Sequence, residues 1–328
     1  MKLIDPYRRA LTYLRISITD RCNLKCLYCS PHNGFPKLSH KDILSYEEIL
    51  RIARIGVQLG IRKIRITGGE PLTRKGVNHF IGKLHQIHGL QDISLTTNGV
   101  LLKEHIDSLI DSGLRRINIS LDTLNPEKFE KITGMNFFNQ VWDGILKANQ
   151  SGLFPIKINT VALRHINDDE LTEIARLSLI YPFHFRFIEY MPMGSSTRWI
   201  SPSLYAPEIK QRLTECIGRL IPVDHQDNDG PAERYRFENA VGEVGFISAM
   251  SHDFCHSCNR LRLTSSGQIR SCLLTDYQED IKTPLRRGAS DEDLSVIFIK
   301  AARLKGIRHG LNPDAPDGVT GQMSSIGG

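Results

Sequence analysis

The sequence predicts an α/β protein whose core is an incomplete (β/α)6 barrel, resembling part of the eightfold (β/α) barrel. Short β-branched runs alternate with helical segments about six times, and polar motifs follow the ends of these runs. No apolar stretch reaches the roughly 18 residues of a membrane span. In such barrels the chemistry lies at the carboxyl ends of the strands. The alternation therefore predicts both the fold and the place of the active site.

The expected strands are short runs rich in β-branched residues, and they span residues 12–19, 62–67, 92–96, 115–121, 156–163 and 185–190. The helices between them have their own signals. Ser45 and Glu48 form a capping box before a helical pattern that stops at Gly60. Similar patterns predict helices over residues 101–112, 139–151 and 168–180. The strand and helix order predicts a mostly parallel sheet.

The length of 328 residues predicts two domains. The regular pattern fades after about residue 200, and residues 225–236 are polar and turn-rich. We therefore expect a barrel over residues 1–224 and a smaller C-terminal region over 225–328, and we assign no role to loops 31–44 and 225–236. The net charge of +6 suits an anionic ligand but is too small for a nucleic-acid interface. Charges near the N-terminus exclude a signal peptide, so a cytoplasmic protein is expected.

Cysteine usage indicates metal chemistry. Seven cysteines without a secretory signal favour thiolates that bind metal or react over disulfides, and the isolated Cys216 is simplest as a structural thiol. Cys22, Cys26 and Cys29 lie in CNLKCLYC, directly after the first expected strand. Three soft thiolates suit an iron–sulfur cluster, and a four-iron cluster would keep one iron open to a small ligand. A zinc knuckle completed by His32 is the alternative.

A second cysteine set lies near the C-terminus. Cys255, Cys258 and Cys272 offer three further thiolates, and two arginines follow at once in CNRLRL. Cations beside an open metal site favour an anionic ligand. The residues alone leave two kinds of site open: an iron–sulfur cluster, or a structural zinc completed by a neighbour such as His252 or His256.

The motif TGGEP follows the second expected strand, where two glycines permit close backbone approach and Glu70 and Pro71 would fix the turn. CNLKCLYC followed by TGGEP resembles the radical S-adenosylmethionine (SAM) superfamily over residues 10 to about 200. The resemblance implies the partial (β/α)6 barrel and a [4Fe-4S] cluster whose open iron binds SAM. Reductive cleavage of SAM then gives a 5′-deoxyadenosyl radical.

The two cysteine sets and the terminal Gly327-Gly328 resemble, nearly end to end, one family of this superfamily, the GTP 3′,8-cyclases. The resemblance implies a second [4Fe-4S] cluster that holds the guanine of GTP. It also implies removal of the C3′ hydrogen and bonding of C3′ to C8, which gives 3′,8-cyclo-7,8-dihydro-GTP in the first step of molybdenum cofactor biosynthesis. The diglycine would thread into the active site. No protein side chain is expected as a catalytic acid or base.

The resemblance assigns the remaining site residues by motif. The expected SAM contacts are Tyr28, Gly69, Ser120 and Met191. The expected GTP contacts are Arg15, Arg65, Thr96, Lys157, Arg260, Leu261 and Arg262. Most basic residues of a protein are solvated surface charges, but Arg15, Arg65 and Lys157 lie inside apolar strands. Their placement favours contact with a triphosphate.

Expected partners are the substrate GTP, an external electron donor, a second copy in a homodimer and the downstream cyclic pyranopterin monophosphate synthase, with neither nucleic acid nor membrane. Two other functions compete. A radical SAM maturase that modifies peptides would share the barrel, but it would usually carry more C-terminal cysteines and would not need the gathered cations. A zinc-bearing nucleic-acid module would need aromatic residues within a basic face, and aromatics make up only 7% of this sequence.

Overall fold

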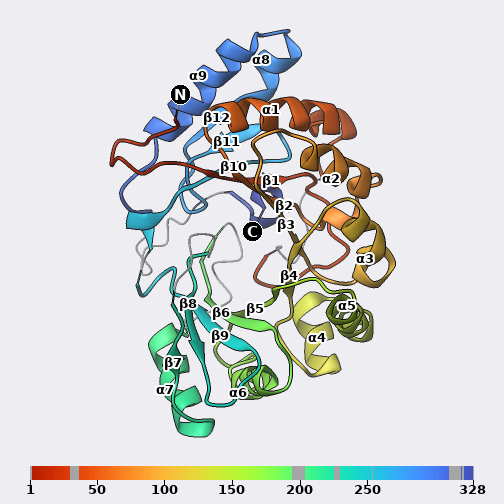
Figure 1. The fold of residues 1–328 in the computed structure, drawn as a ribbon, viewed down its shortest axis with the longest axis vertical. Helices are drawn as coiled ribbons and strands as arrows, with labels where there is room; N and C mark the ends of the chain where they lie inside the picture. Colours follow the sequence, from red (N-terminus) through yellow and green to blue (C-terminus); the bar gives the residue numbers. More distant parts are fainter. Residues whose placement is uncertain are drawn as a thin grey trace.

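The computed structural model describes residues 2–29, 37–193, 204–224, 230–252, 254–309, 319 and 321–327. Within these residues one 12-stranded sheet curves around a central space, and helices cover its outer face (Figure 1). The strand order is β12-β11-β10-β1-β2-β3-β4-β5-β6-β9-β8-β7. The predicted α/β partial barrel is confirmed. No helix of the described part is long and apolar enough to cross a membrane.

The six central strands pair in parallel in the order of the sequence. They are β1 (Tyr13–Ser17), β2 (Lys63–Thr67), β3 (Asp92–Thr97), β4 (Arg116–Ser120), β5 (Ile156–Ala162) and β6 (His184–Glu189). Each lies within two residues of an expected strand. Because all six run the same way, their carboxyl ends meet at one rim of the barrel.

The helices that connect these strands begin and end on recognisable local signals. Ser45 and Glu48 form the expected capping box at the start of α1 (Tyr46–Gln58), and Gly60 has a left-handed φ of 109° just beyond it. The expected helices are found as α3 (Leu102–Asp111), α5 (Phe138–Gln150) and α6 (Leu171–Arg176), the last continued by a short 3-10 turn. The structure adds α2 (Val77–His85) and α4 (Pro126–Thr133).

The later part of the chain extends the sheet at both edges. After α7 (Ala206–Cys216), strand β9 (Glu243–Ile247) pairs in parallel with β6, and β10 (Arg260–Leu263) pairs in parallel with β1. The outer strands are antiparallel: β7 (Ile221–Pro222), β8 (Glu233–Arg236), β11 (Gln268–Arg270) and β12 (Gln278–Asp280). Helices α8 (Lys282–Arg286) and α9 (Asp291–Arg303) follow. The sheet is continuous through both parts of the chain, and the division at residue 224 stays a prediction.

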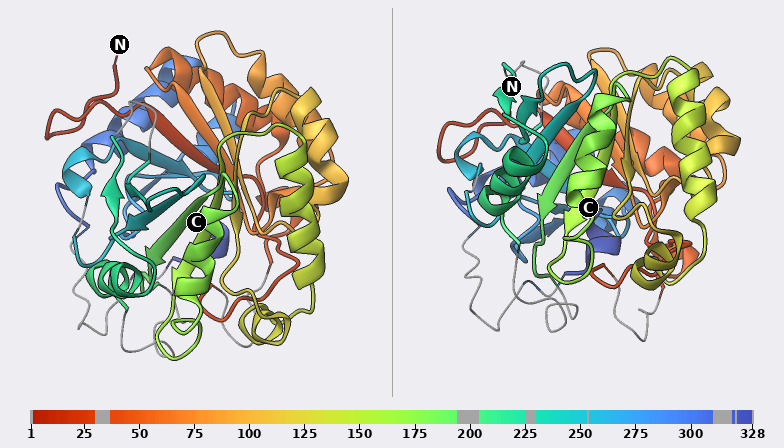
Figure 2. Two further views of the ribbon diagram at one scale, coloured as in Figure 1. Left: turned by 60° about the horizontal axis from the view of Figure 1, so that its bottom comes forward. Right: turned by 90° about the horizontal axis from the view of Figure 1, so that it is seen from below.

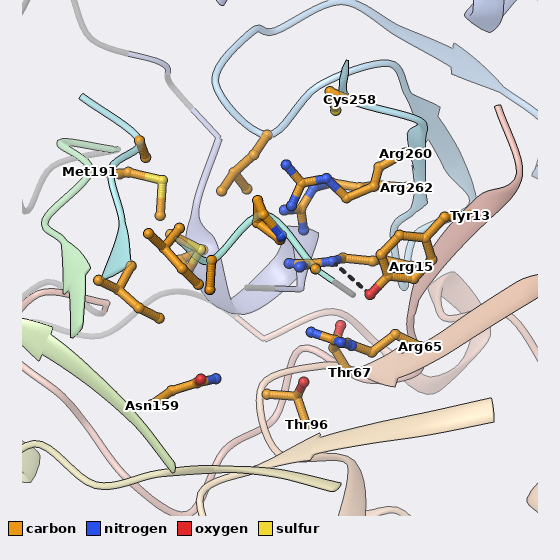
Figure 3. A pocket seen from close by; sticks show the side chains of 18 of the residues that line it. Tyr13, Arg15, Arg65, Thr67, Thr96, Asn159, Met191, Cys258, Arg260 and Arg262 are labelled. Carbon is orange, nitrogen blue, oxygen red and sulfur yellow. Dashed lines mark hydrogen bonds between the residues drawn. The ribbon is translucent and has the colours of Figure 1, made fainter. Parts of the chain in front are cut away.

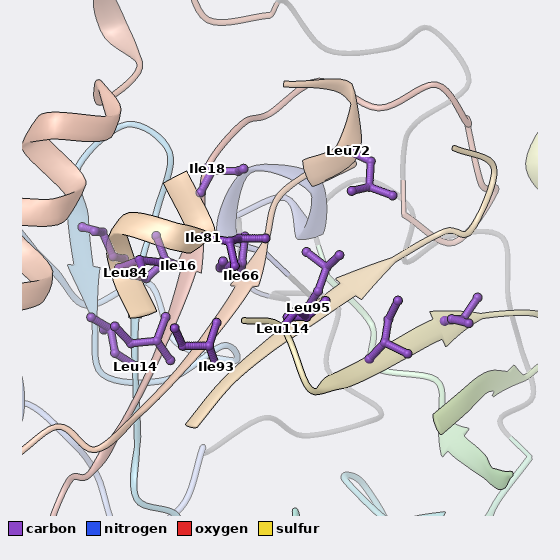
Figure 4. Close-up of a cluster of buried hydrophobic side chains, with 14 of the residues drawn as sticks. Leu14, Ile16, Ile18, Ile66, Leu72, Ile81, Leu84, Ile93, Leu95 and Leu114 are labelled. Atoms are coloured by element: carbon purple, nitrogen blue, oxygen red, sulfur yellow. The ribbon is translucent and has the colours of Figure 1, made fainter. Parts of the chain in front are cut away.

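The two faces of the central strands differ in chemistry. Leu14, Ile16 and Ile66 are fully buried in the apolar cluster between sheet and helices (Figure 4), and so is Ile64. The alternate residues of the same strands face the inside of the barrel, because side chains alternate along a strand. Among them is Arg15. A parallel sheet is usually apolar on both faces, so a polar inner face indicates a site.

Candidate active site

One large cavity runs through the inside of the barrel. Its volume is about 790 Å³, within the range of ligand-binding pockets. Residues of both expected cysteine sets line it, as do the strand-borne arginines, so motifs more than 200 positions apart in the sequence share one space. Figure 3 shows Arg15, Arg65, Arg260 and Arg262 reaching in from one side, with Met191 on the opposite side.

The first cysteine set lies on the loop after β1, at the carboxyl rim. Cys22, Cys26 and Cys29 are free, partly buried thiols, and Cys29 lines the cavity. The backbone N–H of Cys29 donates to the Cys26 carbonyl over 2.9 Å, which turns the loop back on itself. Burial, and after it the nearby Cys22, raise the pKa of Cys29 to about 12. Three soft donors on one loop fit an iron–sulfur cluster, which binds them as thiolates.

The two glycines after β2 permit this loop to lie directly on the barrel. The N–H of Gly69 donates to the Thr19 carbonyl over 2.7 Å, and the N–H of Glu70 donates to the Arg21 carbonyl over 2.7 Å. A Cβ at Gly69 would lie 2.4 Å from the Arg21 carbonyl oxygen. A side chain there would push the cysteine loop outward, so glycine is required by packing as well as by any ligand.

Glu70 joins two strand-end motifs. Its carboxylate accepts hydrogen bonds from the Leu72 N–H (3.0 Å), the Thr97 hydroxyl (2.8 Å) and the Asn98 N–H (2.6 Å). Burial raises the pKa of Glu70 to about 7, although these three donors lower it. The expectation that Glu70 fixes the turn is confirmed, and the turn is held against the TTNG segment after β3.

The expected SAM contacts gather at the same rim. Tyr28 donates its hydroxyl to Asp122 over 2.6 Å, and Val161 donates its N–H to the other oxygen of Asp122 over 2.8 Å. Burial raises the pKa of Asp122 to about 6. Tyr28, Gly69, Ser120 and Met191 all line the cavity.

The cations gather farther down the barrel through strand register. Arg15 pairs in register with Arg65 on β2 and with Arg262 on β10, so three arginines stand side by side. Burial, together with the neighbouring Arg65 and Arg260, lowers the pKa of Arg15 to about 10 against the opposing effect of Tyr13. Burial likewise lowers the pKa of Arg262 well below its ordinary value. Within the described residues these buried cations form no ion pair with a carboxylate, and such a cluster favours a polyanionic ligand.

Tyr13 lies among these cations. Arg15 donates its Nε hydrogen to the Tyr13 hydroxyl over 3.3 Å, and the Arg15 and Arg65 guanidinium carbons lie 5.6 and 5.7 Å from the ring centre. Such distances are within the range of cation–π contacts. Burial by itself would raise the pKa of Tyr13, but Arg65, Arg15 and their neighbours outweigh it and lower the pKa to about 8.

The second cysteine set lies at the opposite end of the barrel. Arg260 pairs with Tyr13 at the start of β1, so Cys255 and Cys258, which precede it, lie at the amino end of the strands. Cys272 follows β11, whose antiparallel register brings it to the same end. All three are free thiols that line the cavity. In the described residues no three His, Cys, Asp or Glu side chains converge closely enough to hold a single metal ion.

The C-terminal segment enters the barrel, where helix α10 (Met323–Ile326) lies inside the curve of the sheet (Figure 2). Gly327 accepts a hydrogen bond at its carbonyl from the Arg262 guanidinium. A Cβ at Gly327 would lie 2.0 Å from Thr67 Oγ1 and 3.2 Å from Ser17 Cβ, and its φ is 84°. Only glycine fits this position without strain. Gly328 and His32 lie outside the described residues.

The structure brings most of the expected GTP contacts to the cavity wall. Those that line it are Arg15, Arg65, Thr96, Arg260 and Arg262. Leu261 and Lys157 are absent from the wall: Leu261 is buried in the apolar cluster between sheet and helices, and Lys157 is buried on β5. Lys157 is two residues before Asn159, so both face the barrel interior and Lys157 lies deeper.

Sequence reasoning missed several wall residues, among them Tyr13, Lys63, Asn159 and Arg186. Arg186 and Asn159 follow the rule that identified Arg15, because each is a polar residue within an apolar strand. The Oδ1 atom of Asn159 is buried and has no hydrogen-bond partner in the described residues, which suits a ligand donor.

Comparisons with known proteins agree with this arrangement. A Radical SAM superfamily model matches residues 16–178, and a Molybdenum Cofactor Synthesis C model matches residues 183–311. A GTP 3′,8-cyclase of Pelotomaculum thermopropionicum is 44% identical over 326 residues, covering 99% of each chain. That of Thermodesulfovibrio yellowstonii is 47% identical over 327 residues, again covering 99% of each chain.

Solved structures share the fold at low identity. SuiB of Streptococcus suis bound to S-adenosylmethionine has a TM-score of 0.59 and 16% identity, and the match covers 84% of this chain and 64% of SuiB, less than two thirds of its length. Native anSMEcpe with bound AdoMet also gives a TM-score of 0.59 at 16% identity, covering 90% of this chain and 81% of that protein. At this identity the likeness shows the fold alone.

Proposed function

This chain belongs to the GTP 3′,8-cyclase family, and we propose how its cavity performs the reaction of that family. It is a radical SAM enzyme of molybdenum cofactor biosynthesis that cyclises GTP to 3′,8-cyclo-7,8-dihydro-GTP. The observation that carries the proposal is one cavity that Cys29 of the first cysteine set lines at one end and all three cysteines of the second set line at the other, with a cluster of arginines on its wall.

The cofactors divide between the two ends. When bound, a [4Fe-4S] cluster with SAM supplies a 5′-deoxyadenosyl radical at the carboxyl rim, and a second [4Fe-4S] cluster supplies an open iron for guanine. Cys22, Cys26 and Cys29 would hold the first cluster. Cys255, Cys258 and Cys272 would hold the second. In domain terms, residues 1–224 would carry SAM and residues 225–328 would carry the guanine end.

The side chains at the rim orient SAM. Tyr28 would cover the adenine, and its hydrogen bond to Asp122 fixes the ring. Gly69 presents backbone without a side chain, and Ser120 and Met191 close the cavity around the nucleoside. These residues bind and orient; no protein acid or base takes part in the chemistry.

The strand arginines place GTP between the two ends. Arg15, Arg65 and Arg262 stand in register and would neutralise the triphosphate, with Arg260 toward the second cluster and Thr96 on β3, the strand next to that of Arg65. Lys157, below Asn159, adds a positive charge without reaching the wall, and Leu261 would contact GTP only through its backbone. A fixed triphosphate sets the position of C3′ relative to the rim, and this is how the chain selects the hydrogen that is removed.

We extend the proposal to partners and location: an external electron donor, a homodimer, the downstream cyclic pyranopterin monophosphate synthase as pathway partner, and the cytoplasm. The peptide-maturase alternative is not favoured. This chain shares its fold with SuiB, but a peptide substrate gives no reason for arginines in register along the cavity.

The experiment replaces cysteines at one end at a time. Cys26→Ser should abolish 5′-deoxyadenosine formation in reconstituted protein, because it removes a ligand of the SAM cluster. Cys258→Ser should retain slow 5′-deoxyadenosine formation and lose cyclised GTP. The exposed Cys216→Ser is the matched control and should behave as wild type. Cyclised product from Cys258→Ser would contradict the assignment of the second end.

A further inference from the structure

Lys305 is a buried cation that the reaction does not use. Lys305 follows α9, is only 4% exposed, and lines the cavity close to the second cysteine set. Its Nζ donates to the Arg260 carbonyl over 3.0 Å and to the Ser271 carbonyl over 2.8 Å. Within the described residues it makes no ion pair with a carboxylate. A buried ammonium with carbonyl partners alone is costly unless an anion lies nearby.

Arg9 is a second cation that binds backbone carbonyls near the second cysteine set. Its guanidinium donates to the Cys255 carbonyl and, over 2.6 Å, to the Gly306 carbonyl next to Lys305. Asp5 fixes the other side of Arg9 through a 2.5 Å contact between Nε and Oδ2, and both side chains are nearly inaccessible. The N-terminal segment thus holds Arg9 rigidly against residues 305–307.

Together the two cations hold every segment that carries a cysteine of the second set. Arg9 bonds the carbonyl of Cys255 itself. Lys305 bonds the carbonyl two residues after Cys258 and the carbonyl one residue before Cys272. These carbonyls belong to the start of β10 and the turn after β11, two strands that also pair with each other. The cations are themselves joined, because Arg9 bonds the residue that follows Lys305.

We propose that Lys305 and Arg9 are positioning residues that hold the three cysteines of the second set at the spacing of an iron–sulfur cluster, with Lys305 supplying a counter-charge to the bound cluster. The inference rests on the proposed function only in taking these cysteines as cluster ligands. Ligands held in place before the metal arrives bind it more tightly, and outer residues that orient ligands commonly change metal affinity by about 10- to 100-fold. A fixed positive charge also favours the reduced, more negative state of the cluster.

The test compares Lys305→Met with Lys305→Arg and with the matched control Lys300→Met, an exposed lysine of α9. Each protein is reconstituted, and its iron content and the midpoint potentials of its clusters are measured without GTP. Lys305→Met should lose about half of the bound iron, or keep the second cluster at a lower potential, while the first cluster and 5′-deoxyadenosine formation persist. Lys305→Arg should restore part of the loss, and Lys300→Met should match wild type.

The first cluster serves as an internal folding control. If Lys305→Met loses both clusters, the Arg9→Gln variant provides the test. Loss of only the second cluster in Arg9→Gln supports the proposal. Retention of both clusters with unchanged midpoint potentials in Arg9→Gln overturns it. Wild-type iron content and potential in Lys305→Met would also overturn it. Failure of the wild-type protein to cyclise GTP would instead refute the proposed function. The iron contents and potentials, which are measured without GTP, would still test the positioning role of Lys305 and Arg9.

Discussion

The carbonyl of Gly327 accepts a hydrogen bond from the guanidinium of Arg262. This contact joins the C-terminal tail to the arginines of β1, β2 and β10, and it lies against Ser17 and Thr67 at the ends of the first two strands. Met323 and Ser324 of the same tail line the cavity. The tail thereby orients Arg262 within the cavity that would hold GTP.

Replacing Gly327 by alanine should displace the tail. The added Cβ would lie 2.0 Å from Thr67 Oγ1, and the left-handed φ adds strain. We expect at least about a tenfold loss of GTP cyclisation, measured as kcat/KM, with little change in the iron content, since the tail holds no cysteine. Gly82→Ala in α2 is the control, because nothing lies within 4 Å of its Cβ position. Normal cyclisation by Gly327→Ala would show that the tail is dispensable.

Glu70→Ala should loosen the SAM end of the cavity. Three donors, from Leu72, Thr97 and Asn98, would lose their acceptor in a buried place, and we expect a loss of roughly 2–4 kcal/mol in the free energy of unfolding. SAM affinity should fall with it, because the turn carries Gly69. Isothermal titration and thermal melts provide the measurement, with the exposed Glu104→Ala as control. A melting temperature equal to that of wild type would contradict the role of Glu70 as a tie between the strand ends.

Tyr13 should ionise at unusually low pH. The surrounding cations outweigh burial and lower its pKa from 10.0 to about 8. The folded protein therefore loses this proton at a lower pH than the unfolded chain does. The phenolate stabilises the folded state fully above about pH 10, and this stabilisation is lost as the pH falls through about 8. The difference in absorbance near the phenolate band between wild type and Tyr13→Phe should titrate with a midpoint near 8. GTP should raise the midpoint by neutralising the arginines. A midpoint near 10 without nucleotide would refute this electrostatic description.

Arg65→Ala should weaken GTP binding. Arg65 is only 9% exposed, it faces the cavity beside Arg15, and its Nε donates to the Ser94 hydroxyl over 3.2 Å. Loss of a charge-assisted contact costs about 1.5–3 kcal/mol, or roughly 10- to 150-fold in Kd. Binding should be measured for GTP and guanosine, since only the triphosphate should sense the change. Arg115→Ala, at an exposed position, is the control. Equal losses for GTP and guanosine would place Arg65 at the base rather than the triphosphate.

The sequence predicted those features that depend on patterns within short stretches of the chain. The six central strands, the capping box at Ser45 and the cysteine sets follow from spacing and periodicity within short windows. The pairing of β10 with β1 could not be predicted in this way, because it joins residues more than 200 positions apart and produces no periodic pattern in the sequence. That pairing sets Arg262 beside Arg15. For the same reason the sequence could place Lys157 on a strand but could not show whether its side chain reaches the cavity wall. The carbonyls that Lys305 binds also have no sequence signature.

The most direct test of the central claim is anaerobic turnover of reconstituted protein with SAM, a strong reductant and GTP that carries deuterium at C3′. A cavity that fixes the triphosphate between two clusters predicts deuterium in 5′-deoxyadenosine, with cyclised product formed from GTP and none formed from ATP. Formation of 5′-deoxyadenosine without deuterium would contradict the claim, because the radical would then be generated while another atom, or another substrate, is its target.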